Sequence, residues 1–174
     1  MVPAATSPAA RLRGVSHPAL GLPTTDMTAG SPAAADRIRA ARGRLAARAL
    51  EAAVEGDPTI RERHGEAGLR QLLRDTDGYL ERVARAVASG DPAQVGEWAE
   101  WVAPVFRRRR VPMDDLIALS EGVRVALAAV LAGDDRSVAD AALDAGIAVS
   151  RWHRGLGGDA RKRNRYLFAL YKGG

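Results

Sequence analysis

The sequence predicts an all-α protein, with a disordered segment over residues 1–30 and an antiparallel bundle of five to six helices over residues 31–174, whose core lies in residues 69–154. Alanine, leucine and arginine favour helices and dominate the composition, whereas the residues that strands prefer are scarce. Glycine and proline pairs recur between apolar stretches of helical period, as in short connections between helices. Because 47% of the residues are hydrophobic but only 5% aromatic, we expect a thin core with closely approaching helices.

The first 30 residues are rich in Pro, Ala, Ser, Thr and Gly and have neither a helical nor a strand period, which indicates disorder. Ser31 and Pro32 then supply an N-cap and a first-turn proline, and Gly56-Asp57-Pro58 supplies a stop. These signals predict a helix over about 31–55. Its arginines cover much of its circumference, which is typical of a solvated outer helix; binding to nucleic acid or to an acidic surface is the alternative.

The next helix is expected over about 69–88, after a single turn over 59–64 that breaks near Gly65 and Gly68. Gly78 lies inside this helix and costs roughly 1 kcal/mol relative to alanine, which suggests close approach by a neighbouring helix. Ser89-Gly90 ends it. Its apolar residues recur every three or four positions and form one stripe: Leu69, Leu72, Leu73, Thr76, Tyr79, Leu80, Val83 and Val87.

A third helix opens with Asp91-Pro92, which repeats the pattern of a cap followed by proline. Val95, Trp98, Val102 and Val105 share one face of it. Pro104 lies well inside this helix, so we expect a kink or an early end there.

Four consecutive arginines, Arg107–Arg110, separate this helix from the next, which Pro112 opens. Asp114 and Asp115 fall in its first turn, where carboxylates are favourable at the positive end of the helix dipole. The apolar residues that follow keep a heptad spacing, which predicts a helix as far as Gly133: Leu116, Leu119, Val123, Leu127 and Val130.

Two further helices are expected in the C-terminal part. The first begins at Asp134 or Asp135 and ends at Gly155, which supplies a left-handed stop. The second, over about 159–171, is basic at its start and apolar at its end, so we expect it to dock on its own bundle or on a partner.

Composition excludes several kinds of site. The chain has no cysteine, which rules out disulfides and thiolate chemistry. It has no run of about 18 apolar residues and no apolar core of a secretion signal, so we expect a cytoplasmic protein without a membrane partner. Of the net charge of +5, residues 107–110 and 159–174 each carry +4, whereas residues 59–106 and 111–158 are net acidic.

The basic charge therefore gathers in one loop and one tail. This pattern suggests contacts to phosphates or to an acidic partner, because guanidinium groups concentrate charge and hydrogen-bond donors. The alternative is a helix end where cations satisfy terminal carbonyls and solvent covers the rest. The candidate contact residues are Arg107, Arg108, Arg109, Arg110, Arg161, Lys162, Arg163 and Arg165; whether the two groups form one surface is left open.

Three tryptophans, Trp98, Trp101 and Trp152, could line a ligand pocket. At helical spacing, large aromatic residues more often fill a core that is otherwise mostly alanine. Trp101 is offset from the apolar stripe and is expected to face outward.

The histidines His17, His64 and His153 have no second ligand at metal spacing, and His153 is expected to cap the end of its helix. His64 could serve as a haem ligand or a general base only with support from other residues. The carboxylates fall in capping or surface contexts, and familiar catalytic motifs are absent. We therefore expect no enzyme, no metal site and no cofactor.

Residues 69–131 show a pattern that resembles the helical N-terminal sensor or interaction bundles of bacterial regulatory proteins, some of which precede cobalamin-binding or signalling domains. The resemblance implies a non-catalytic sensory or docking bundle. Similar bundles often have glycine where this chain has Arg110, so the turn could differ, and the cobalamin-ligating Asp-x-His-x-x-Gly pattern is absent. The residues that carry the resemblance are Tyr79-Leu80, Ala86, Ser89-Gly90-Asp91-Pro92, Trp98, Trp101, Arg110-Val111-Pro112, Leu116 and Leu119.

Three functions are compatible with these features. The leading hypothesis is a regulatory or protein-interaction bundle of bacterial origin with a protein partner, which includes a homodimer through an apolar helix face. The second is nucleic-acid binding through Arg107–Arg110 and the basic C-terminal helix, without reading of the base sequence. The third is a sensor of a small molecule or haem that uses the tryptophans and His64 or His153.

Overall fold

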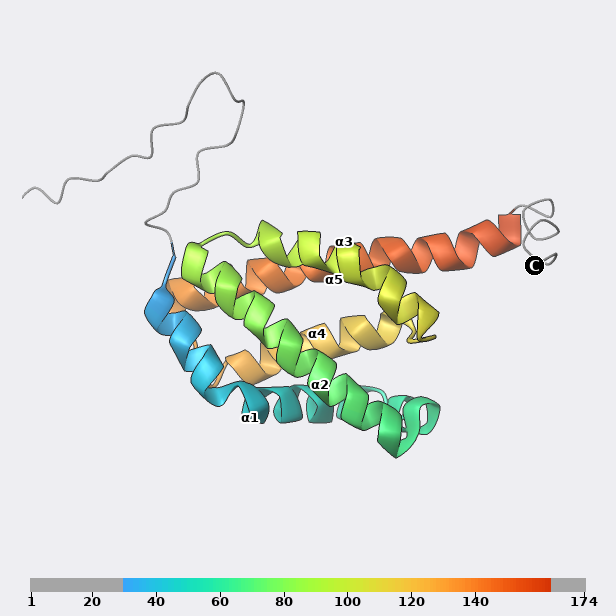
Figure 1. The fold of residues 1–174 in the computed structure, drawn as a ribbon, viewed down its shortest axis with the longest axis horizontal. Helices are drawn as coiled ribbons and strands as arrows, with labels where there is room; N and C mark the ends of the chain where they lie inside the picture. The colour runs from blue at the N-terminus through green and yellow to red at the C-terminus, as the bar shows by residue number, and fades with distance from the viewer. Residues whose placement is uncertain (1–29, 164–174) are drawn as a thin grey trace, which may run out of the picture.

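The fold comes from a computed structural model that describes residues 30–163, with side chains described over residues 30–156. This part of the chain forms five helices and no strand (Figure 1). The expected all-α class is confirmed, and the helix count lies within the expected range. The expectation of disorder over residues 1–30 falls almost entirely outside the described residues. The helices are α1 (Pro32–Gly56), α2 (Thr59–Ser89), α3 (Ala93–Arg108), α4 (Met113–Leu127) and α5 (Gly133–Arg163).

The first two helices form an antiparallel pair, since the backbone N–H of Ser31 donates to the carbonyl of Val87 and Arg42 pairs with Asp77. α4 packs on α1, and α5 packs on both α4 and α3. Unlike the expected antiparallel neighbours, α3 and α5 run in the same direction, as their colours show in Figure 1. Gly96 lies beside Ala145 and, further along both helices, Glu100 pairs with His153, which gives the same direction.

The helix ends follow the sequence signals closely. The hydroxyl of Ser31 accepts a hydrogen bond from the backbone N–H of Ala34, and a proline stands at the start of α1, as expected. Gly65 has non-helical dihedral angles (φ 56°, ψ −175°), which confirms the break between the single turn and the longer part of α2. Gly90 adopts φ 70° and ends α2 in the left-handed conformation.

The core is built largely from alanine, as expected. It comprises two clusters, a larger one to which all five helices contribute, α3 through Val95, and a smaller one near the α1–α2 and α3–α4 connections. The close helix approach occurs at Gly122, where an added Cβ would collide with the carbonyl oxygen of Ala49 on α1. The expectation for Gly78 is wrong, because Gly78 lies on the exposed side of α2 with no atom within 4 Å of the position of a Cβ.

The C-terminal helix differs from expectation in length. Gly155 does not stop it, and the helices expected over 134–154 and from 159 onward are one continuous helix as far as Arg163. A left-handed stop needs a positive φ, which Gly155 does not adopt. A single glycine costs only about 1 kcal/mol inside a helix, so its neighbours can carry the helix through it. The remainder of the predicted last helix lies outside the described residues.

The two helices that flank the arginines also differ from the sequence prediction. The early end expected at Pro104 is wrong, since α3 continues to Arg108. Pro104 lies on the exposed side of the helix. α4 ends at Leu127, before the expected Gly133, and a turn over 128–130 follows. No helix in the described part of the chain is both long and apolar enough to cross a bilayer.

Candidate ligand site

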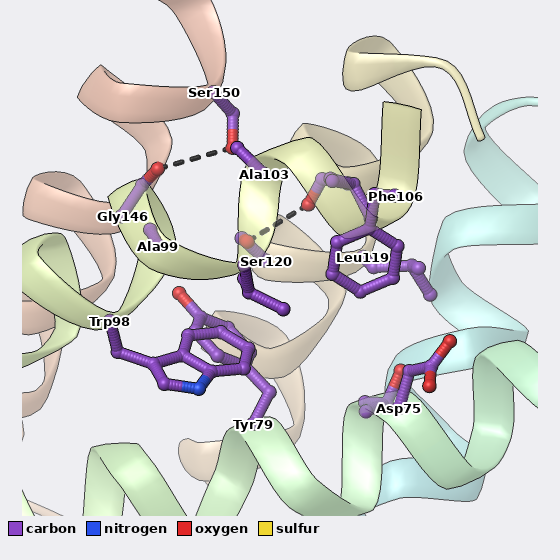
Figure 2. A pocket seen from close by; sticks show the side chains of 13 residues that line it. Asp75, Tyr79, Trp98, Ala99, Ala103, Phe106, Leu119, Ser120, Gly146 and Ser150 are labelled. Carbon is purple, nitrogen blue, oxygen red and sulfur yellow. Dashed lines mark hydrogen bonds between the residues drawn. The ribbon is translucent and has the colours of Figure 1, made fainter. Parts of the chain in front are cut away.

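A partly open cavity of about 50 Å³ lies between four helices of the structure (Figure 2). Its wall is mainly apolar, with a few polar groups at separate positions. This combination of a concave apolar wall and a few placed polar groups is typical of small-molecule sites. The lining residues are Asp75, Thr76 and Tyr79 from α2, Trp98, Ala99, Val102, Ala103 and Phe106 from α3, Leu116, Leu119 and Ser120 from α4, and Gly146 and Ser150 from α5.

The most unusual polar group of this cavity is the Tyr79 hydroxyl. Its oxygen is buried and has no hydrogen-bond partner among the described residues. Burial raises the pKa of Tyr79 to about 12, and an interaction with the Ser120 hydroxyl, which does not meet hydrogen-bond geometry with Tyr79, opposes this shift. A buried hydroxyl without a partner costs free energy on the order of 1–3 kcal/mol, so an available partner would stabilise it.

The Tyr79 ring is held by an aromatic contact. It stacks on the indole ring of Trp98 with ring centroids 5.4 Å apart and an interplanar angle of 26°. Figure 2 shows the two rings facing each other from α2 and α3. A Cβ at Gly146 would lie 2.8 Å from the Tyr79 hydroxyl oxygen, so glycine at this position leaves the hydroxyl its space.

Three other hydroxyls line the cavity, and each donates its proton to a backbone carbonyl one turn earlier. Thr76 donates to the carbonyl of Leu72 at 2.8 Å, Ser120 to that of Leu116 at 2.9 Å and Ser150 to that of Gly146 at 3.2 Å. Figure 2 marks the bonds made by Ser120 and Ser150. These protons are already committed, whereas that of Tyr79 is not.

An ion pair connects the cavity wall to the arginine block. Asp75 accepts hydrogen bonds from Arg109 at 2.7 Å and from the side-chain amide of Gln71 at 2.9 Å. The same guanidinium lies over the Phe106 ring, 5.3 Å from its centroid. Arg109 is therefore fixed against two residues of the cavity wall.

The other arginines of the block behave differently. Arg107, Arg108 and Arg110 are exposed and form no ion pair with the residues whose side chains are described. Arg110 has φ 60°, a left-handed conformation that glycine adopts freely.

The basic C-terminal group is only partly described. Arg161, Lys162 and Arg163 belong to the last turns of α5, which projects past the ends of the other helices in Figure 1. Their side chains and the whole of Arg165 lie outside the described residues.

The three tryptophans do not form one pocket. Trp98 lines the cavity and packs against the main core, whereas Trp101 is 74% exposed and Trp152 is 57% exposed. The outward position of Trp101 confirms its expected offset from the stripe. Interpreting Trp152 as a core residue is wrong, because the neighbouring His153 occupies the buried face of α5 instead.

Sequence reasoning missed a cluster around Asp115. This carboxylate is 1% exposed, and its oxygens lie 2.6 Å from Arg63 Nη2 and 2.6 Å from His64 Nε2. In the sequence, the position of Asp115 in the first turn of a helix already accounted for an aspartate there, so its burial was not expected. The helical register contained the missing signal, because Asp115 lies on the same face of α4 as the buried residues Leu119, Gly122 and Ala126.

Arg63 connects this cluster to the α1–α2 connection. It also pairs with Asp57 at 2.8 Å, and hydrogen bonds to Asp115 and Asp57 raise its pKa. The hydrogen bond from Arg63 in turn lowers the pKa of Asp57. This cluster is an ion-pair network that attaches the first turn of α2 to the start of α4.

His153 does not cap a helix end, because α5 continues beyond it. The side chain is buried, with Nε2 3.0 Å from Glu100 Oε2 and with Nδ1 lacking a partner among the described residues. Neither His64 nor His153 lines the cavity. Over the residues with described side chains, no three His, Asp or Glu residues gather in a way that could hold a metal ion.

These features define the class as an all-helical protein with a partly open, largely apolar cavity bordered by four helices. Neither protein-family models nor curated protein sequences give a match to this chain.

Proposed function

We propose that this chain is a non-catalytic regulatory helical bundle that binds a small molecule in the cavity beside Tyr79 and signals its presence to a protein partner. The observation that carries the proposal is the buried Tyr79 hydroxyl without a partner, at the wall of a partly open apolar cavity. Such a group usually has a hydrogen-bond partner in a folded protein. A bound molecule would supply this partner.

The volume limits what the cavity can hold. About 50 Å³ exceeds the space that one water needs but is well below the roughly 150 Å³ of an engineered cavity that binds benzene. A short ligand fits as the cavity stands. A longer one extends through the open side or needs Trp98 to turn, which its partial exposure favours.

The regulatory part of the proposal rests on Arg109. Because this side chain contacts both Asp75 and Phe106, a ligand that moves the cavity wall also acts on the connection between α3 and α4. Arg107, Arg108 and Arg110 lie at this connection and face solvent, where an acidic protein partner can reach them.

Xenon provides the test, because it binds to apolar cavities without any polar contact. Amide resonances of isotope-labelled protein under xenon pressure are expected to shift around the cavity and at residues 107–112. Ala103→Leu fills the cavity from α3 and should remove these shifts, whereas Ala141→Leu on the exposed side of α5 should preserve them. Unperturbed cavity resonances in the unmodified protein would overturn the proposal.

Nucleic-acid binding is a second candidate, favoured by three exposed arginines within four consecutive positions, Arg107, Arg108 and Arg110. Fluorescence anisotropy with a short DNA duplex at about 50 mM salt would detect phosphate contacts. A triple alanine variant of Arg107, Arg108 and Arg110 leaves Arg109 in place, and it should reduce the slope of log affinity against log salt by up to about 2.7. No binding of the unmodified protein at low salt would remove this candidate.

A further inference from the structure

Two side chains of the cavity wall carry protons that no described residue accepts. They are the Tyr79 hydroxyl and the indole N–H of Trp98, and an indole nitrogen can only donate. The other hydroxyl protons of the wall, on Thr76, Ser120 and Ser150, are bonded to backbone carbonyls. A ligand that accepts a hydrogen bond therefore gains most here, because the groups that still lack a partner are donors.

Tyr79 needs such an acceptor more than Trp98 does. The Tyr79 hydroxyl is buried, whereas Trp98 is only partly buried, so water can reach its indole N–H. A donor without a partner costs free energy only where it has lost its water. Gly146 leaves space beside the hydroxyl, since a Cβ there would lie 2.8 Å from the oxygen. The acceptor of a ligand therefore belongs at Tyr79, on the side of Gly146.

The wall holds no cation that could balance a charged ligand. No arginine, lysine or histidine in the described part of the chain lines the cavity, and the carboxylate of Asp75 is already bonded to Arg109 and Gln71. Asp75 also lies away from the Tyr79 hydroxyl in Figure 2. An ionised group buried beside Tyr79 would lose its water without gaining a countercharge in the wall, which costs much more than burial of a neutral oxygen.

We infer that the ligand is a small, largely apolar molecule whose uncharged oxygen accepts the Tyr79 proton, with a ketone as the simplest case. The inference rests on the proposed function, since it names the class of molecule that the same cavity binds. The oxygen lies beside Gly146, and the apolar body lies against Ala99, Val102 and Ala103 of α3.

Acetone and xenon together separate the hydrogen bond from the cavity. Both are titrated into isotope-labelled full-length protein and into its Tyr79→Phe variant, with shifts of the cavity amides as the readout. Tyr79→Phe should weaken acetone binding about fivefold, because it removes the donor. Xenon binding should stay within about twofold, because xenon makes no polar contact, and its shifts also show that the variant keeps the cavity. Acetone binding that is equally tight in both proteins would overturn the inference.

Two further variants serve as controls for acetone. Ser120→Ala removes another hydroxyl of the wall, whose proton is bonded to the Leu116 carbonyl, so acetone binding should change less than about twofold. Equal weakening by Ser120→Ala and Tyr79→Phe would contradict a specific contact with Tyr79. Shifts that acetone still causes in Ala103→Leu, where the cavity is filled, arise from the solvent and are subtracted.

Acetate tests whether the ligand is uncharged. It has the planar shape of acetone but carries a negative charge at about pH 7. We expect it to bind at least about tenfold more weakly than acetone, because the wall offers no countercharge. Sodium chloride at the same concentration controls for ionic strength. Acetate binding as tightly as acetone would reject the uncharged class.

Failure of this inference and failure of the proposed function give different results. Xenon shifts without acetone shifts, or acetone binding that Tyr79→Phe leaves unchanged, would retain a ligand site and reject this class of ligand. Cavity resonances that respond neither to xenon nor to acetone would reject both.

Discussion

Arg109 Nη2 at the end of α3 lies 2.7 Å from Asp75 Oδ2 on α2, and this ion pair joins the arginine block to the wall of the cavity. Both side chains are partly buried, with exposed fractions of 34% and 19%. The block is thus divided, since Arg109 pairs with Asp75 whereas the other three arginines face solvent without an ion pair to any described side chain.

The ion pair predicts unequal contributions from neighbouring arginines. Arg109→Ala should lower the free energy of unfolding by about 1 kcal/mol, because it removes a partly buried ion pair and the contact with Phe106. Arg108→Ala should cost less than about 0.5 kcal/mol, as expected for a side chain in solvent. Urea unfolding of both variants measures the difference, and equal losses would show that the ion pair contributes nothing.

Tyr79 predicts a specific dependence on pH. Burial raises its pKa to about 12, above the value of about 10 in an unfolded chain. The unfolded state therefore loses this proton first, so the contribution of Tyr79 to stability is complete below about pH 10 and is lost as the pH rises toward about 12.

Tyr79→Phe should remove this loss, which reaches up to about 1.4 kcal/mol per pH unit. Urea unfolding at about pH 9 and about pH 11 compares the slopes of the two proteins. A variant that loses as much stability as the unmodified protein over this range would contradict the buried position of the hydroxyl.

The Asp115 cluster predicts a large difference between two adjacent aspartates. Asp115→Ala should cost about 2–4 kcal/mol, because it leaves Arg63 and His64 without their shared buried acceptor. Asp114→Ala, one position earlier, removes only the exposed pair with Arg154 and should cost less than about 1 kcal/mol. Thermal and urea unfolding give both values, and similar costs would mean that Asp115 is not buried.

Two glycines predict effects of opposite sign. Gly122→Ala should destabilise the protein by about 1–3 kcal/mol, since its Cβ meets the Ala49 carbonyl at the contact of α1 and α4. The Cβ added by Gly78→Ala would lie in open space beside α2, so this substitution should stabilise the protein by about 0.5–1 kcal/mol. Urea unfolding measures both free energies of unfolding. A Gly122→Ala protein as stable as the unmodified protein would mean that α1 and α4 do not approach closely at Gly122.

Arg110 predicts a stabilising replacement. Its φ of 60° is costly for a residue with a Cβ, so Arg110→Gly should increase the free energy of unfolding by about 0.5–1 kcal/mol. Arg107→Gly within α3 should decrease it by up to about 1 kcal/mol. If Arg110→Gly is also destabilising, Arg110 makes a contact that outweighs its backbone conformation.

Much of the fold could be predicted because helix signals are local. The cap at Ser31, the break at Gly65, the stop at Gly90 and the start at Pro112 each depend on a few consecutive residues. The errors at Gly78 and Gly155 share one cause, since a glycine inside a helical pattern does not reveal what lies beside it or whether its φ becomes positive.

The candidate site was less accessible to the same reasoning. The offset of Trp101 from the apolar stripe predicted its outward position, but nothing in the sequence predicted that Trp98 stacks on Tyr79 and lines the cavity. Asp114 and Asp115 both suit a helix start, yet only Asp115 is buried against the first turn of α2. Which aspartate is buried and which side chain Trp98 contacts depend on the rotation of one helix against another.

The sequence by itself determined the helical class, the main helix boundaries and the local concentration of positive charge at Arg107–Arg110, because propensity, capping and net charge are properties of short segments. Only the tertiary structure decided that Arg109 pairs with Asp75, that Arg63 and His64 share Asp115 and that the Tyr79 hydroxyl lies at a cavity without a partner. These relations join residues that lie more than 30 positions apart or come from different helices. Burial and pairing there follow from how the helices pack, which no single segment specifies.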